Sequence, residues 1–152
     1  MLLLFSGSLS AMPDSSPFPG GVIVLDIGSS KWARFDNRNV MVLKKDSSNI
    51  AVLGISLQKE PGEYQIETQE GNLSFSIKPK TYPTQHLTIK NRNHVNPPKR
   101  DLDRIFRERQ EMGEVFKNFR SETNIDMNFF LPAEGIISSE FGMRRYLNGQ
   151  AR

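Results

Sequence analysis

Few side chains of this protein could take part in chemistry, and its two histidines are the first candidates. Imidazole is a frequent zinc ligand and carries protons near neutral pH. His86 and His94 are the two histidines, and neither has a second histidine or a carboxylate at the spacing of a metal-binding motif. This spacing favours ordinary surface or loop positions over a metal site.

Three glutamates follow at intervals of three residues: Glu108, Glu111 and Glu114. A pair of carboxylates can serve acid–base catalysis. On a helix, however, these glutamates would lie beside Arg104 and Lys117 on the face exposed to solvent. Such a pattern is typical of surface ion pairs, and we favour that interpretation.

Other chemical motifs are missing from the sequence. The 152 residues include no cysteine, which excludes disulfide bonds and thiolate metal sites. No serine stands in a Gly-x-Ser-x-Gly motif, and no glycine-rich phosphate loop occurs. The sequence therefore offers no nucleophile motif and no nucleotide-binding motif.

Positive charge collects between Glu70 and Asp101, where the sequence has no acidic residue. Such a stretch could bind an anionic polymer, for example cell-wall glycan or lipopolysaccharide. We favour the alternative, a solvated loop and an edge strand protected by lysines. Tyr82 is the one aromatic residue among the basic ones, so a surface that stacks nucleic-acid bases is not expected despite the net charge of +3. The basic residues are Lys78, Lys80, Lys90, Arg92, Lys99 and Arg100.

Short apolar runs predict the elements that would position these residues. Turn signals such as Asp36-Asn37 and Pro61-Gly62 separate the runs. This spacing predicts a mainly β fold, a small antiparallel sandwich of immunoglobulin-like shape. The expected strands cover residues 22–27, 40–43, 50–57, 64–68, 73–77 and 87–89.

The pattern changes after Asn96-Pro97-Pro98. From Leu102 to Phe119, apolar residues recur at helical intervals, which predicts an amphipathic helix of about 20 residues. Asp101 and Lys117 lie in its first and last turns, where the helix dipole favours those charges.

The first residues are similar to the end of a secretory signal peptide. Leu2–Phe5 is apolar, and small residues follow as far as Ala11. A basic first region and a full apolar core are missing, so a disordered N-terminal tail is the alternative. Pro13–Gly21 is rich in Pro, Ser and Gly and predicts a linker. No apolar stretch approaches the roughly 20 residues that span a bilayer.

The most specific motif lies at residues 129–152. Phe130-Leu131-Pro132 precedes Gly135-Ile136-Ile137-Ser138-Ser139, and Phe141-Gly142-Met143-Arg144 follows. This order resembles the entry to the catalytic domain of lysostaphin-type (LytM-like) zinc metallopeptidases, where Phe/Trp-x-Pro leads to Gly-x-Ile-Ser-Ser-x-Phe-Gly-x-Arg. Upstream residues resemble the β domain that precedes such peptidases, so the similarity extends over residues 18–152.

The resemblance implies a domain organisation. Residues 1–21 would be a signal-peptide remnant and linker, 22–96 an N-terminal β domain, 97–121 a linker helix, and 122–152 the first strands of an incomplete LytM-like peptidase domain. Within the last segment, four residues would be structural parts of the motif: Ser138, Ser139, Phe141 and Gly142. Phe141 would pack into the catalytic sheet and Gly142 would permit a tight turn. Three residues would line the substrate groove or anchor a loop: Arg144, Arg145 and Asn148.

The resemblance also implies where the metal would be held. The family binds one Zn²⁺ through His-x-x-x-Asp and a later His-x-His, which are expected beyond Arg152. His86 and His94 do not match these motifs, so we assign no catalytic residue and no metal ligand to this chain. Zinc would belong to the parent protein, and the fragment alone would be inactive.

The expected function is therefore that of the N-terminal part of an exported zinc metalloendopeptidase. It would hydrolyse peptide cross-links in peptidoglycan, in the periplasm or cell envelope of a Gram-negative bacterium, and would contact its own catalytic domain. One alternative is a zinc-less LytM-like regulator or wall-binding protein that activates other murein hydrolases. Another is a free-standing immunoglobulin-like module that binds the wall.

Overall fold

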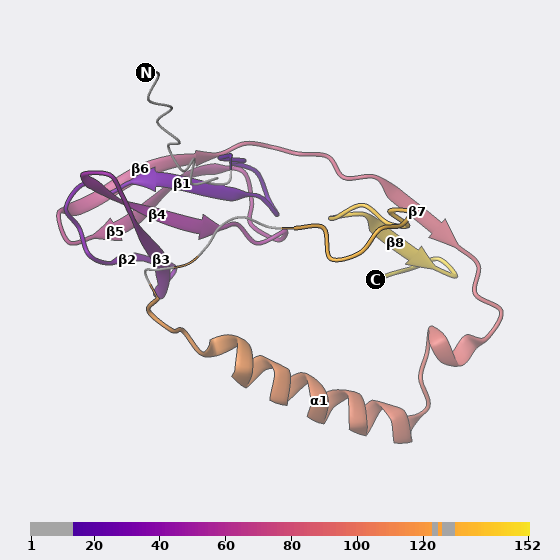
Figure 1. Cartoon of the computed structure of the whole chain (residues 1–152). Coiled ribbons are helices and arrows are strands. Elements are labelled where there is room, and N and C mark those ends of the chain that lie inside the picture. The colour runs from indigo at the N-terminus through magenta and orange to yellow at the C-terminus, as the bar shows by residue number, and fades with distance from the viewer. Residues whose placement is uncertain (1–13, 123–124, 126–129) are drawn as a thin grey trace, which may run out of the picture. The chain divides into compact units, whose positions relative to one another are not determined.

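The computed structural model describes residues 14–122, 125 and 130–152 (Figure 1). The expected signal peptide falls on residues 1–13 and so lies outside the described residues, as does Phe129. Backbone contacts divide the chain into two units. The first unit holds the described residues up to Pro79 together with those of Ser121–Ile136, and the second holds Lys80–Arg120 and Ile137–Arg152.

The first unit is built on a six-stranded sheet with the order β1-β4-β3-β2-β5-β6. All of its strand pairs are antiparallel, so the mainly β, antiparallel class predicted from the sequence is confirmed. The strands are β1 (Val22–Asp26), β2 (Ala33–Phe35), β3 (Arg38–Lys45), β4 (Ser48–Gly54), β5 (Gly62–Thr68) and β6 (Gly71–Ile77).

Strand β3 changes partner along its length, and this makes the sheet curl. Residues 38–40 pair with β2, whereas residues 41–45 pair with β4. The predicted sandwich is therefore realised as one curled sheet, because β3 connects its two halves instead of leaving them as separate sheets.

Alternating residues of these strands form the core. Ile66 and Ala51 are fully buried, and each large apolar side chain that is removed from water contributes about 1.5–3 kcal/mol. Phe35, Tyr64 and Phe75 pack ring against ring at one side of this core, with centroids 5.4–6.1 Å apart. The buried cluster comprises Ile23, Ile27, Ala33, Val40, Ala51, Leu53, Ile55, Ile66, Phe75 and Ile77.

The turn predicted at Asp36-Asn37 joins β2 and β3. Both residues have positive φ, 49° and 60°, as a two-residue type I′ hairpin turn requires. Strand β2 itself was not predicted, because three residues are too few to show an alternating pattern.

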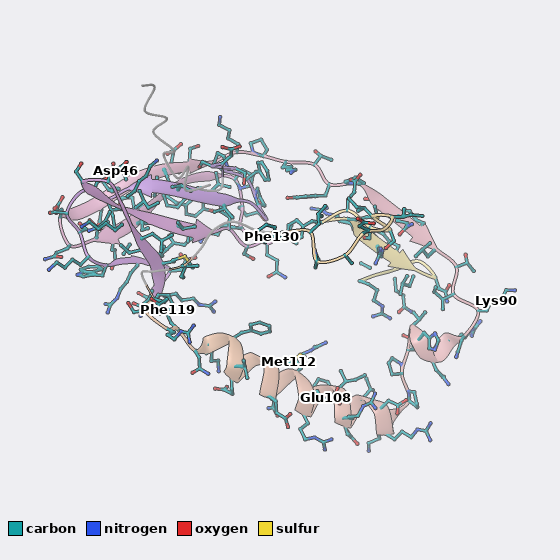
Figure 2. All side chains as sticks on the ribbon, in the orientation of Figure 1. Asp46, Lys90, Glu108, Met112, Phe119 and Phe130 are labelled. Carbon is teal, nitrogen blue, oxygen red and sulfur yellow. The ribbon has the colours of Figure 1, made fainter. Side chains whose placement is uncertain are left out.

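In the second unit, α1 spans Lys99–Lys117, within the predicted helical segment. None of its residues is buried, and Phe116 is 85% exposed. Figure 2 shows Glu108 and Met112 among the side chains that project from α1. The expected surface ion pairs are present, between Arg104 and Glu108 at 3.5 Å and between Lys117 and Glu114 at 2.6 Å. Among the described residues, no helix is both long and apolar enough to cross a membrane.

The second unit also contains a three-stranded sheet with the order β7-β8-β9. Its strands are β7 (Thr84–Leu87), β8 (Arg144–Leu147) and β9 (Gln150–Ala151), and the 3₁₀ turn η1 (Arg92–His94) lies between β7 and α1. Strands β7 and β8 are parallel, and β8 and β9 are antiparallel. The strand expected at residues 87–89 therefore lies at 84–87, since its position is set by pairing with β8 and not by its own apolar residues.

Candidate functional site

The parallel pair β7–β8 fixes the position of the residues that follow the Phe-Gly-x-Arg motif. Thr84 lies opposite Arg144, and Gln85 lies opposite Arg145. The Arg144 N–H donates to the carbonyl of Pro83 at 2.9 Å. The motif is thus joined by main-chain hydrogen bonds to a segment that precedes the helix.

Arg145 connects three parts of the second unit. Its Nε donates to Oε1 of Gln85 at 3.1 Å, and its second guanidinium nitrogen donates to Oγ of Ser139 at 2.8 Å. Arg145 is half-buried, whereas Arg144 is exposed. The structure therefore brings Arg145 and Ser139 together and leaves the Arg144 guanidinium facing solvent.

Asn148 pairs with the main chain of Ile89 through both atoms of its amide. Oδ1 accepts from the Ile89 N–H at 2.8 Å, and Nδ2 donates to the Ile89 carbonyl at 3.0 Å. The Asn148 N–H also donates to the carbonyl of Leu87 at 3.0 Å. Because a carboxamide has the same donor and acceptor as a peptide group, the side chain continues the β7–β8 ladder beyond the end of β8.

The β8–β9 turn consists of Asn148 and Gly149, with φ of 52° and 80°. Both values suit a type I′ turn, for which Asn-Gly is the preferred pair. The turn fixes the backbone of Asn148 and so aims its side chain at Ile89.

Two structural features favour glycine at position 142. Its φ is 81°, a conformation that side chains disfavour, and a Cβ at this position would collide with the ring of Tyr82. Phe141, which was expected to pack into a sheet, is 70% exposed in this chain. Ser138 is also exposed.

The two histidines have partners other than a metal. His86 stacks on Tyr146, with the ring centroids 4.7 Å apart and the planes inclined by 13°. Nε2 of His94 lies 3.3 Å from Nδ2 of Asn91. Within the described ranges, no three His, Cys, Asp or Glu side chains are placed to hold a metal ion. The residues present there do not fit a zinc site, so the chemistry of that metal cannot be assigned to them.

Several residues of this site were not singled out from the sequence. Gln85, Ile89 and Tyr146 contact the predicted residues only because two distant segments pair. Arg152 is a further example, since its N–H donates to the carbonyl of Arg145 at 2.8 Å and its guanidinium donates to the carbonyl of Val95. The resemblance of the upstream residues to the family's β domain was the one signal that pointed to this segment.

Comparisons with known proteins agree with this arrangement. The Peptidase family M23 N-terminal domain model matches residues 15–80. A crystal structure of a Pseudomonas aeruginosa protein classed as an M23 peptidase is similar, with a TM-score of 0.65 and 29% sequence identity over 84% of this chain. The present chain covers 52% of that protein and so spans about half of its length. None of the curated proteins that were compared matches the chain.

These matches cover both the curled sheet and, for the solved structure, most of the remaining residues. Residues 15–80 therefore match the N-terminal domain of peptidase family M23, and the chain as a whole is similar to a solved structure classed as an M23 peptidase.

Proposed function

We propose that the chain is the N-terminal part of an exported zinc metalloendopeptidase that hydrolyses peptide cross-links in peptidoglycan. One observation carries the proposal. An M23 N-terminal domain at residues 15–80 is followed by the motif that resembles the entry to a LytM-like catalytic domain, in a chain that spans about half of an M23 structure.

In this proposal the residues of the chain position the catalytic part and do not perform the reaction. The β7–β8 pair holds the approach to the catalytic domain against the segment before α1. Arg145 orients Ser139 through a hydrogen bond. Asn148 fixes the β8–β9 hairpin through its hydrogen bonds to Ile89. The zinc ligands would lie in the remainder of the parent protein.

The proposal is tested by comparing the 152-residue chain with the product of the complete reading frame. Release of dye from labelled peptidoglycan is measured with and without a metal chelator. We expect the complete protein to release dye and to lose that activity with chelator, and the 152-residue chain to release none. Chelator-sensitive release by the 152-residue chain alone would contradict the proposal.

Export to the periplasm or cell envelope is part of the proposal. It is supported by the apolar residues 2–5 and the small residues that follow them. Alkaline phosphatase gains activity only after export, because its disulfides form outside the cytoplasm. Fusion of residues 1–21 to this reporter should give active enzyme, whereas replacement of Leu3 and Leu4 by Asp should abolish its activity.

A regulator that activates other murein hydrolases is the second candidate. The exposed apolar residues of α1, Phe106 and Phe116, favour it because they offer a surface for a protein partner. A complete protein that stimulates another hydrolase, lacks His-x-x-x-Asp and releases no dye by itself would support this function over the first.

A further inference from the structure

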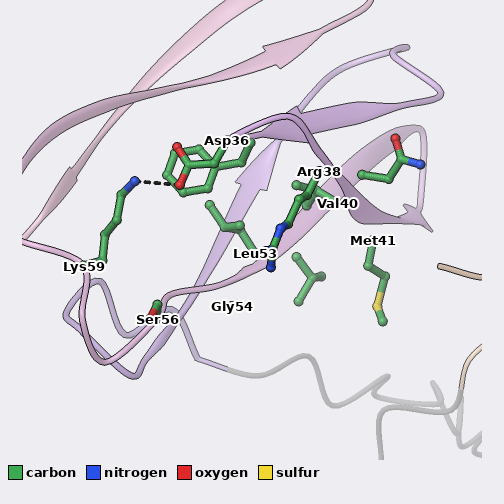
Figure 3. Close-up of a pocket in the computed structure, with 11 residues that line it drawn as sticks. Asp36, Arg38, Val40, Met41, Leu53, Gly54, Ser56 and Lys59 are labelled. Atoms are coloured by element: carbon green, nitrogen blue, oxygen red, sulfur yellow. Dashed lines mark hydrogen bonds and ion pairs between the residues drawn. The ribbon is translucent and has the colours of Figure 1, made fainter. Parts of the chain in front are cut away.

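The first unit contains a pocket of about 510 Å³ at the point where β3 leaves β4 and joins β2 (Figure 3). This volume lies within the range of small-molecule sites. Arg38 and Val40 of β3 line it, as do Leu53 and Gly54 of β4. Figure 3 shows the Arg38 side chain reaching from β3 toward β4 among the lining residues.

The pocket exposes main-chain edges of both strands. The last pair between β3 and β4 is Met41 with Val52. Beyond it, Leu53 and Gly54 pair only with β1, and residues 38–40 pair only with β2. A Cβ on Gly54 would meet no atom within 4 Å, so the sheet face at this residue is open. An extended peptide can form hydrogen bonds to strand edges of this kind.

The charges of the pocket leave one cation without a partner. Nζ of Lys59 lies 2.6 Å from Oδ2 of Asp36 and 4.7 Å and 4.6 Å from the ring centroids of Phe35 and Tyr64. The charge of Lys59 is therefore neutralised by the Asp36 carboxylate. Arg38 is exposed, and its guanidinium has no hydrogen-bond or ion-pair partner among the described residues.

The remaining wall is mixed, with the polar Asn39 and Ser56 beside the apolar Val40, Met41, Val52 and Leu53. Val40 and Leu53 are each only 7% exposed, and Met41 and Val52 are half-buried. A guanidinium binds a carboxylate through two parallel hydrogen bonds, and the apolar part of the wall suits small side chains. The pocket thus combines a carboxylate partner, main-chain edges and an apolar surface.

We propose that this pocket binds the C-terminal carboxylate of a short extended peptide with small side chains. Arg38 holds the carboxylate, and the edges of β3 and β4 hold the peptide groups. The inference goes beyond the proposed function, because such binding requires neither a metal nor hydrolysis.

The test uses the whole 152-residue chain labelled with ¹⁵N and titrated with N-acetyl-Ala-Ala. We expect saturable shifts of the amide signals of Arg38 and Gly54. The same peptide with a C-terminal amide should bind about tenfold more weakly or worse, because it lacks the charge that Arg38 pairs with. Acetate at the same concentration should not displace the peptide, since acetate makes no contact with the strand edges.

Two variants and one control complete the experiment. Arg38→Gln removes the charge and should weaken binding at least about tenfold. Gly54→Leu fills the open space and should prevent binding while Arg38 is retained. Lys45→Gln is the matched control, because Lys45 is an exposed cation on the same strand and does not line the pocket.

The proposal would be overturned by equal binding of the acid and the amide, by equal effects of Arg38→Gln and Lys45→Gln, or by the lack of any saturable shift. Displacement by acetate at equal concentration would also overturn it, because the site would then bind a simple anion and not a peptide.

Discussion

At the scale of the residue, single side chains hold the second unit together. Asn148 replaces a peptide group, Arg145 joins Ser139 to Gln85, and Gly142 makes room for Tyr82. Each of these roles can be isolated by a matched pair of substitutions.

Asn148→Gly removes both hydrogen bonds to Ile89 and keeps a residue that tolerates positive φ. We expect it to destabilise the second unit by about 1–2 kcal/mol, from two hydrogen bonds of modest net strength. Exchange of the Ile89 amide hydrogen, followed by NMR, measures the effect. Asn148→Asp keeps the acceptor and should protect that hydrogen better than Asn148→Gly does. Equal exchange in all three proteins would rule out the pairing.

Gly142→Ala and Gly149→Ala separate steric collision from backbone strain. Both glycines have φ near 80°, but a Cβ meets Tyr82 at Gly142 and open space at Gly149. Gly149→Ala should cost about 1–2 kcal/mol from the left-handed conformation alone. Gly142→Ala should cost about 1–3 kcal/mol more, because the ring must move. Urea denaturation, monitored by the NMR signals of β8, compares the stability of the two variants. Equal losses of stability would show that the Tyr82 ring moves aside freely.

At the scale of the element, the sequence predicted the strands and the helix that have a local pattern but not those that depend on distant residues. The alternation of Phe75 and Ile77 and the periodicity around Ile105 predicted β6 and α1, because those patterns are local. Strand β2 is too short to show one. The choice of β8 as the partner of β7 depends on residues far apart in the chain, so neither the parallel sheet nor the contact of Asn148 with Ile89 could be predicted.

Helix α1 gains little from tertiary packing, so its own propensity should matter. Gly113 lies in its interior, and a Cβ there would meet no atom within 4 Å. Gly113→Ala should therefore stabilise the helix by about 1 kcal/mol and raise the helical signal in circular dichroism. Glu111→Ala is the control for a change on the same helix and should have a smaller effect. A lower helical signal in Gly113→Ala would mean that the glycine is needed for a contact.

At the scale of the whole molecule, burial differs sharply between the curled sheet and residues 136–141. Ile66 and Ile77 of the first unit are at most 2% exposed, whereas Ile136 and Ile137 are 97% and 82% exposed. Hydrogen exchange should therefore be slowest in β5 and β6 and fast at residues 136–141. Strong protection of residues 136–141 in the monomer would contradict this expectation.

The pairing of β7 with β8 has a consequence for the order of synthesis. Gln85 and Arg145 are 60 positions apart, and a ribosome adds about 5–20 residues per second. Strand β7 therefore waits about 3–12 s after it is made before its partner exists. During that interval α1 can already form, since a helix needs only local contacts. The second unit is thus completed only after the β8–β9 hairpin has left the exit tunnel and β8 has paired with β7.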